Sequence, residues 1–498
     1  MHRMCAVLLS FGAAVVIGGA PPSASAASEG CIPGGSTDFN GDGTVDVAVA
    51  DPGATVNGVV NSGRVHVLSG GQEGTVSLPL TPPGGAVRFG TALATTDVNL
   101  DGCDDLLVGA PDEAVTVGGA TVDKAGAIYL YFGAQDGLGT PMRITQGTTL
   151  GGSAPEAGDN FGASLAAGTT ASGVPFVLAG APGESVGSLS AAGSVFYLYN
   201  GAWTELTEDS PTVEGFAEAG DRWGSVLAAT SLHFAVGDPL EDISQFVDSG
   251  NVDVFRHASA SNGAISVGFL NQEMPGQSGY GESGDHFGAS LAMTVFTDGT
   301  RLKSLLAIGV PGEAMESNSQ PDAGRVVATV TISDAVDTTE LLEIHQDVAD
   351  VDGASETGDA FGSALAIVNR AATGVVPAWS DLLLAVGIPG EEGGLTDQGG
   401  IQVFSLVGGA GEHDRWVDPA IVANTGWTPK AGARMGAYLS ASSSHLFIGD
   451  PAGNTPALWA VPWSVVTGQS TTDPIYAIRP GLNGVPPTGT GTFGAAAV

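Results

Sequence analysis

The chain has 498 residues, of which 77 are glycine and 28 are proline, and only 14% are charged. The 53 acidic residues outnumber the 15 basic ones, and a net charge of −38 argues against nucleic acid or anionic lipid as a partner. The stretches between turn-forming residues are too short for long helices.

Residues 1–26 have the pattern of a secretory signal peptide. His2 and Arg3 give a weakly positive start, residues 5–20 are apolar, and Ala24-Ser25-Ala26 resembles a small-residue cleavage site. A membrane anchor is the alternative, but the apolar run is short and contains glycine. We therefore expect export, a mature chain without a membrane span, and a secreted, extracellular or cell-surface location.

The stretch from Phe89 to Tyr131 contains a unit that recurs along the chain. An alternating apolar run is followed by an acidic loop, a second apolar run that ends in Gly109-Ala110-Pro111, and a third run over residues 127–131. Short apolar runs bounded by Gly, Pro, Asp and Asn predict an antiparallel meander of strands.

The recurrence of this unit predicts the fold. Phe-Gly or a near equivalent begins at Phe89, Phe161, Trp223, Phe287, Phe361, Met435 and Phe493. Gly-x-Pro follows at Gly109, Gly180, Gly237, Gly309, Gly387 and Gly449, and Ala50-Asp51-Pro52 is a degenerate first copy. Seven copies of a four-stranded unit predict an all-β, seven-bladed β-propeller with antiparallel blades over residues 38–498, after a leader at 27–37.

The two ends of the propeller domain complement each other. The first copy, near Asp38, lacks a Phe-Gly strand, whereas Phe493–Val498 is such a strand with no loop or strand after it. We expect the C-terminal strand to join the blade of Val45–Ala50, which closes the ring and removes two exposed sheet edges.

Phe-Gly followed by Gly-Ala-Pro, with Asp-x-Asn-x-Asp-Gly between them, resembles the FG-GAP repeat of the propellers in integrin alpha subunits. The resemblance covers residues 38–498 and implies calcium-binding loops wherever the motif is present. It also implies ligand binding on one face of the ring. Leg domains and a membrane anchor like those of an integrin subunit are not recognisable, so a signalling-receptor role is not implied.

Two acidic loops have the spacing of calcium sites. Loop positions 1, 3, 5 and 9 are Asp38, Asn40, Asp42 and Asp46 in the first loop, and Asp97, Asn99, Asp101 and Asp105 in the second. Alternating oxygen ligands on a tight glycine-containing loop can converge on one Ca²⁺, with the position-7 carbonyls of Thr44 and Cys103 as further ligands. An Asx-rich turn without an ion is the alternative. The later repeats lack this spacing, so we expect two structural calcium sites.

Strand direction predicts a strongly acidic face. Loops that lead into the Phe-Gly strands and loops that follow Gly-x-Pro must open on the same side of the ring, here called face A. The lead-in loops carry Glu156, Asp159, Glu218, Asp221, Glu282, Asp285, Glu356 and Asp359. The following loops carry Glu113, Glu184, Glu241, Asp242, Glu313, Glu391 and Glu392. Bonding to backbone amides of their own turns explains most of these Asp residues but fewer of the Glu residues.

Signals of catalysis are weak. Gly183-Glu184-Ser185-Val186-Gly187 fits Gly-x-Ser-x-Gly, but it follows a Gly-Ala-Pro turn and does not lie between a strand and a helix. His286 beside Asp285 is interpreted as a surface position, because other repeats carry unrelated residues there. We assign no catalytic residue.

Two functions therefore remain open. We favour a monomeric secreted adhesion or ligand-binding module whose partner is an extracellular protein or glycan bound on face A. The alternative is a secreted hydrolase of the FG-GAP type acting on glycolipid or polysaccharide. A deep pocket with converging His and carboxylate groups on face A favours the enzyme, and a shallow surface rimmed by loops favours the module.

Cys31 and Cys103 are the only cysteines after removal of residues 1–26. Export permits oxidation, and only the carbonyl of Cys103 is needed in its calcium loop, so its side chain is available for a disulfide with Cys31. Two unrelated thiols are the alternative.

Overall fold

The computed structural model describes residue 31 and residues 37–498, with gaps at 71–76, 83–86, 148–149, 151, 212, 258–263, 298, 316–318, 333–334, 372–374, 413, 429, 451, 453–455, 483 and 487–491. The expected signal peptide at 1–26 and most of the leader at 27–37 lie outside the described residues. The described chain is almost entirely β-structure. One four-residue helix, α1 (Trp463–Val466), and 3-10 turns at Trp379–Asp381, Ala410–Glu412 and Pro419–Thr425 are its helical segments.

Six antiparallel sheets have four or five strands each. The first contains β4 (Leu93–Thr96), β5 (Asp105–Ala110), β8 (Ala127–Tyr131) and β9 (Met142–Ile144). The second contains β10 (Leu165–Thr169), β11 (Pro175–Ala181), β12 (Ser194–Tyr199) and β13 (Ala202–Leu206). The third contains β14 (Val226–Ala229), β15 (His233–Asp238), β16 (Asn251–His257) and β17 (Ala264–Leu270).

The remaining three follow the same meander. The fourth contains β18 (Ser290–Thr297), β19 (Leu302–Val310), β20 (Arg325–Ile332) and β21 (Ala335–Val336), and β22 (Leu342–Ile344) also pairs with β20. The fifth contains β23 (Ala364–Asn369), β24 (Leu382–Ile388), β25 (Gly400–Ser405) and β26 (Arg415–Val417). The sixth contains β27 (Tyr438–Ala441), β28 (His445–Asp450), β29 (Ala457–Pro462) and β30 (Tyr476–Ile478).

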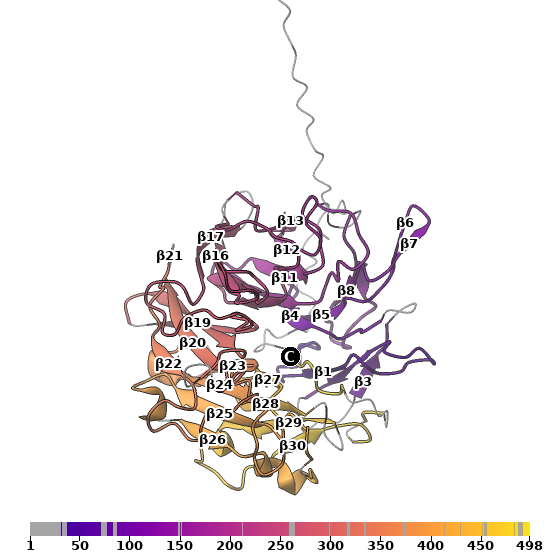
Figure 1. Ribbon diagram of the computed structural model, residues 1–498. Helices are drawn as coiled ribbons and strands as arrows, with labels where there is room; N and C mark the ends of the chain where they lie inside the picture. The colour runs from indigo at the N-terminus through magenta and orange to yellow at the C-terminus, as the bar shows by residue number, and fades with distance from the viewer. Residues whose placement is uncertain are drawn as a thin grey trace, which may run out of the picture.

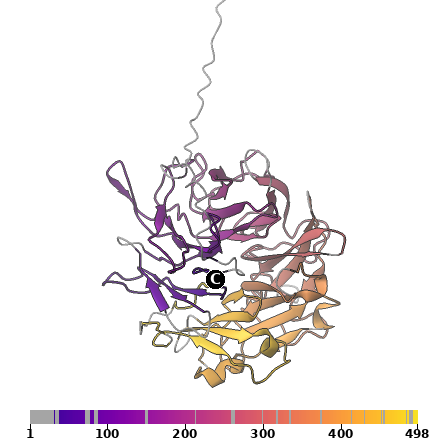
Figure 2. The ribbon, with the colours of Figure 1, turned by 180° about the vertical axis from the view of Figure 1, so that it is seen from behind.

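A three-stranded sheet of β1 (Val47–Asp51), β2 (Arg64–Leu68) and β3 (Ser77–Leu80) lies between the first and sixth of these sheets. The sheets follow one another around a ring, and the colour of the chain runs once around it (Figures 1 and 2). The hairpin of β6 (Val115–Val117) and β7 (Ala120–Val122) projects from its rim (Figure 1). The predicted all-β propeller with four-stranded antiparallel blades is confirmed.

The C-terminal residues pair with β1. Ala48 and Ala50 donate backbone hydrogen bonds to the carbonyls of Val498 and Ala496, both at 2.9 Å, and the Val498 amide donates back to Ala48 at 3.1 Å. Val49 and Ala497 face each other in an antiparallel bridge. The expected pairing of Phe493–Val498 with the first blade is therefore present.

The glycines of the two motifs meet where neighbouring sheets pack. A Cβ atom on Gly309 would lie 2.1 Å from the carbonyl oxygen of Gly362, the glycine of the next Phe-Gly pair. The same approach joins Gly109 to Gly162, Gly180 to Gly224, Gly237 to Gly288, Gly387 to Gly436 and Gly449 to Gly494. Glycine is required at these positions because no side-chain atom fits between the two backbones.

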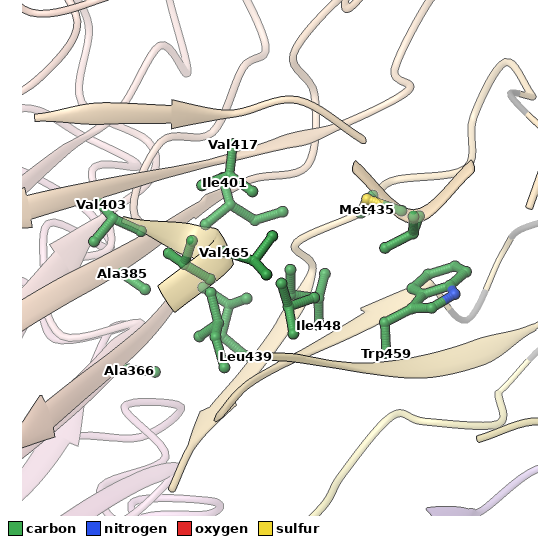
Figure 3. Close-up of a cluster of buried hydrophobic side chains, with 14 of the residues drawn as sticks. Ala366, Ala385, Ile401, Val403, Val417, Met435, Leu439, Ile448, Trp459 and Val465 are labelled. Atoms are coloured by element: carbon green, nitrogen blue, oxygen red, sulfur yellow. The ribbon is translucent and has the colours of Figure 1, made fainter. Parts of the chain in front are cut away.

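The hydrophobic core lies between successive sheets. In Figure 3, Ala385 and Val403 of the fifth sheet face Leu439 and Ile448 of the sixth, with Val465 of α1 beside them. Each sheet thus buries its two faces against two neighbours, which an isolated four-stranded sheet cannot do.

Gly309→Ala tests this packing. The added Cβ would overlap the Gly362 carbonyl, and overpacking of a close contact typically costs about 1–3 kcal/mol. Chemical denaturation should show that loss in the free energy of unfolding. Gly139→Ala is the control, because its Cβ would come no closer than 3.7 Å to the Phe132 carbonyl oxygen. Equal stability of the two variants would contradict the glycine argument.

Candidate metal-binding loops and the acidic face

The first acidic loop is closed by its own side chains. The Asp38 carboxylate accepts backbone hydrogen bonds from Asp42 at 3.2 Å and Gly43 at 2.8 Å. Asn40 accepts from the Asp42 amide at 3.0 Å, and Asp42 accepts from Thr44 at 2.7 Å. The predicted ligand residues at positions 1, 3 and 5 therefore face the inside of one turn.

The second loop repeats this geometry. Asp97 accepts from the amides of Asp101 at 3.1 Å and Gly102 at 2.8 Å, and Asp101 accepts from Cys103 at 3.0 Å. Asn99 bonds to the backbone and the carboxylate of Asp101, as Asn40 does with Asp42. Two loops in different sheets thus share one arrangement of hard oxygen donors, which suits Ca²⁺.

The carboxylates at loop position 9, Asp46 and Asp105, are buried and accept hydrogen bonds from backbone amides of their loops and of neighbouring turns. Asp46 accepts from the amides of Phe39 and Gly70, and Asp105 accepts from those of Val98 and Gly133. Burial raises the pKa of Asp46 to about 6 and that of Asp105 to about 7, although the amide bonds oppose the shift. Each oxygen already accepts one amide, so these two Asp residues have a structural role besides any contact with an ion.

The two loops are joined to each other by a disulfide and by hydrogen bonds. Cys31 and Cys103 form the predicted disulfide, with Cα atoms 5.4 Å apart. Asp104 donates its backbone amide to the Asp38 carbonyl at 3.0 Å, and its carboxylate accepts from the Asp38 amide at 3.1 Å. Cys31 packs so closely against Gly41 that a Cβ there would lie 2.5 Å from the Cys31 Cα. The loops and the disulfide form one unit.

The Asp residues of the lead-in loops bond to their own turns, as the sequence suggested. Asp159, Asp221, Asp285 and Asp359 each accept the backbone amide three residues earlier, at 2.5–2.6 Å. Burial raises the pKa of Asp159, Asp285 and Asp359 to about 7 each. In each of these carboxylates one oxygen therefore holds its own lead-in loop.

Four of the Glu residues after Gly-x-Pro also have hydrogen-bond partners, which the sequence did not predict. Gln146 donates to Glu184 at 2.5 Å, Gln346 donates to Glu391 at 2.7 Å, and Gln272 donates to Glu313. Glu113 instead accepts from the Tyr129 hydroxyl at 2.8 Å and from Arg143 at 2.6 Å. The exposed acids of face A are therefore Glu156, Glu218, Asp242, Glu356 and Glu392.

A sequence signal for the Gln–Glu pairs existed. Each Gln stands 15 residues before the aromatic residue of a Phe-Gly pair, and each Glu stands four residues after the glycine of Gly-x-Pro. The partners belong to different repeats, 38 to 45 residues apart in the chain, so only a comparison across repeats reveals the pairing.

The remaining sequence candidates have structural explanations. His286 has φ 55°, and Asn160, Arg222 and Ala360 adopt the same left-handed conformation before their Phe-Gly or Trp-Gly pairs. Two described hollows, of about 630 and 330 Å³, are lined respectively by residues around β26 and β30 and by Thr44, Asp46 and their neighbours. The face A acids line neither hollow. Among the described residues, no helix has the length and apolar character needed to cross a membrane.

The architecture defines a β-propeller assembled from recurring sequence units. The FG-GAP repeat model matches residues 89–131, and the FG-GAP-like repeat model matches residues 38–108. The chain thus contains FG-GAP repeats within residues 38–131.

Curated relatives match only part of the chain. Human phosphatidylinositol-glycan-specific phospholipase D is 37% identical over 123 residues, which are 22% of this chain and 14% of that protein. Human integrin alpha-10 is 40% identical over 107 residues, 20% of this chain and 8% of that protein. The solved structure of a periplasmic gluconolactonase from Pseudomonas aeruginosa aligns with 83% of this chain and 92% of its own, at 13% identity and a TM-score of 0.40. The matched segments thus span a small part of the curated relatives.

Removal of the Cys31–Cys103 disulfide tests how much it stabilises the fold. The bond joins residues 72 apart, and a cross-link of this kind is typically worth about 2–4 kcal/mol. Cys31→Ser/Cys103→Ser should lower the unfolding free energy by that amount, measured by denaturant titration. Treating the double variant with a reductant is the control, since it should then cause no further loss. A wild-type protein insensitive to reduction would contradict the prediction.

Proposed function

We propose that the protein is a secreted, calcium-stabilised FG-GAP propeller that binds an extracellular protein or glycan through face A. In this proposal residues 1–26 are a signal peptide, 27–37 a leader and 38–498 the propeller. The observation that carries it is the pair of matching acidic loops, held together by hydrogen bonds and the disulfide.

We also propose a count of seven blades, with Phe493–Val498 completing the three-stranded sheet. The close approach between Gly-x-Pro and Phe-Gly glycines occurs at six junctions, the last of which joins Gly449 to Gly494. The seventh junction involves Gly90, whose Cβ would lie 3.0 Å from the Cβ of Ala50, the residue in the Gly-x-Pro glycine position of the degenerate copy. These seven contacts account for a closed ring.

Calcium is proposed for both loops. In the first, Asp38, Asn40, Asp42 and Asp46 would bind the ion, with the Thr44 carbonyl as a further ligand. In the second, Asp97, Asn99, Asp101 and Asp105 would do so, with the Cys103 carbonyl. A bound ion would neutralise carboxylates that now face one another in each turn, and it would fix the two neighbouring sheets at their shared edge.

Calcium removal tests these sites. An ion that binds only the folded state adds about 2.7 kcal/mol at a concentration 100 times its Kd, so Ca²⁺ should raise the melting temperature and a chelator should lower it. Asp42→Ala and Asp101→Ala should each remove part of the calcium-dependent shift. Asp381→Ala, in a turn without the calcium spacing, should leave that shift unchanged. Calorimetry without binding at millimolar Ca²⁺ would contradict the assignment.

Two exposed aromatic residues mark a place for ligand on face A. Phe216 and Tyr280 are each 82% exposed, and each stands seven residues before the aromatic residue of its repeat. Glu218 and Glu282 follow two residues later in the same lead-in loops. An exposed ring beside a carboxylate offers a flat apolar surface together with a hydrogen-bond acceptor, which suits a glycan or a protein side chain.

The ligand test uses the full chain on glycan and extracellular-protein arrays, with and without Ca²⁺. Phe216→Ala/Tyr280→Ala should weaken binding to any ligand found by at least about tenfold, as expected for aromatic anchors. Glu156→Gln, in a lead-in loop without such a ring, is the matched control. Phosphatidylinositol-glycan should be tested as well, because a hydrolase is the second candidate function. The similar phospholipase D is named as specific for that compound. Turnover of that compound would replace the binding proposal with the hydrolase.

A further inference from the structure

Four carboxylates converge at the junction between the second and third sheets. Glu208 follows β13, Asp221 lies in the lead-in loop before Trp223, Asp238 ends β15, and Glu241 lies in the turn after it. One carboxylate oxygen from each residue lies within 4.8 Å of those of the other three. Glu208, Asp221 and Asp238 are buried, and Glu241 is half-buried, which leaves a route to solvent.

Three other junctions have a hydrogen-bond donor at the position that Glu208 occupies. There the residue 15 positions before the aromatic residue is Gln146, Gln272 or Gln346, and its amide donates to the Glu of the Gly-x-Pro turn. Glu208 occupies the same position before Trp223 and faces Glu241. At the other three junctions a Gln amide donates a hydrogen bond to the Glu. Here the Glu208 carboxylate stands in place of that Gln, so Glu241 faces an acceptor and not a donor.

Asp238 adds a further buried charge without a partner. Its position, directly after the glycine of Gly-x-Pro, is alanine at Ala110 and Ala181. Where the position is acidic elsewhere, a donor is present: Asp51 accepts from the Thr492 hydroxyl at 2.5 Å, and Asp450 accepts from the Trp427 indole at 3.0 Å. Asp238 is fully buried, and neither of its carboxylate oxygens has a hydrogen-bond partner.

This arrangement is costly without a cation. Burial, and then the neighbouring acids, raise the pKa of Asp238 and Glu208 far above the usual range. The leading electrostatic contributions at both groups come from other carboxylates, among them Asp221, Asp253 and Glu241. Buried charges are ordinarily paired or bound to a metal, because an unpaired one loses several kcal/mol of hydration.

We propose that Glu208, Asp221, Asp238 and Glu241 bind a divalent cation at this junction, independently of the two acidic loops. Ligand oxygens around one Ca²⁺ lie at most about 5 Å apart, twice a typical Ca–O distance, and these four carboxylates are close enough together to share one ion. An all-carboxylate set without His or Cys favours a hard ion, Ca²⁺ in particular. The site lies on face A, whereas the acidic loops lie at the opposite ends of the strands.

The test is a variant designed from the other junctions of this chain. Glu208→Gln restores the Gln–Glu pair, and Asp238→Ala restores the residue at Ala110 and Ala181, so the double variant should fold. Calcium content per chain, measured by equilibrium dialysis and mass spectrometry, should be one equivalent lower than in the wild type. Glu208→Gln alone should weaken that site roughly tenfold, because a charged ligand becomes neutral.

Glu184→Gln is the matched control, since it also neutralises a face A Glu but at a junction without the cluster, and its calcium content should equal that of the wild type. Asp42→Ala/Asp101→Ala separates this site from the loops, because the loop variant should still lose one equivalent when Glu208→Gln/Asp238→Ala is added. Equal calcium content with and without the cluster substitutions, at saturating Ca²⁺, would overturn the proposal. So would a variant that is more stable in chelator while its metal content is unchanged, which would show that the carboxyls hold protons instead. If the double variant does not fold, the Glu208→Gln titration decides alone.

Discussion

The ring depends on one close backbone contact between neighbouring sheets. In six repeats the residue before the third strand is a glycine with φ between 82° and 94°, and a Cβ there would lie 2.1–2.3 Å from the carbonyl oxygen of the next aromatic or methionine residue. Gly126 forms a parallel bridge with Phe161 in this way, and Gly324 forms one with Phe361. Both glycine contacts occur at five junctions, and one of them occurs at each of the other two. The angle between sheets is therefore set largely by contact of backbone with backbone, and side chains fill the remaining space.

That constraint explains which parts of the structure the sequence could predict. Phe89, Gly109 and most of their equivalents are of the same residue type because they lie at the junctions, so their spacing revealed the repeat, the strands and the ring. The disulfide followed from export and from the two cysteines that remain. The hairpin β6–β7 and the additional short strand β21 were not predicted, because they lie in connections whose sequences do not share the repeat pattern.

The acidic face could be predicted only in part. Strand direction predicts one acidic side, but exposure and pairing depend on contacts between repeats, where loop lengths differ. Glu184 is buried against Gln146, while Glu156 in the nearby lead-in loop is exposed, and nothing in the local sequence of either residue distinguishes them. The acidic residues behind the net charge of −38 therefore fall into two groups. Some are exposed to solvent, and each buried one needs a hydrogen-bond donor or a cation as a partner.

The seam of the ring is the place where the C-terminal residues pair with β1. It needs more stabilising contacts than any other junction. Its contacts join residues far apart in the chain, such as the Gly53 amide and the Thr492 hydroxyl, 439 positions away, so closing the seam costs more chain entropy than any junction between successive repeats. The extra connections of the molecule gather around the blade at this seam: the C-terminal pairing with β1, the Cys31–Cys103 disulfide, and the hydrogen bonds from Asp104 to the Asp38 loop. Junctions farther around the ring have neither a disulfide nor a calcium-type loop among the described residues. The cluster at Glu208 and Asp238 differs from the other junctions in its buried charge. Its position in the ring is ordinary, because it lies between two successive repeats. A cation there would compensate buried charge, whereas cations in the two loops would stabilise the first blade and its neighbour in the chain, beside the seam.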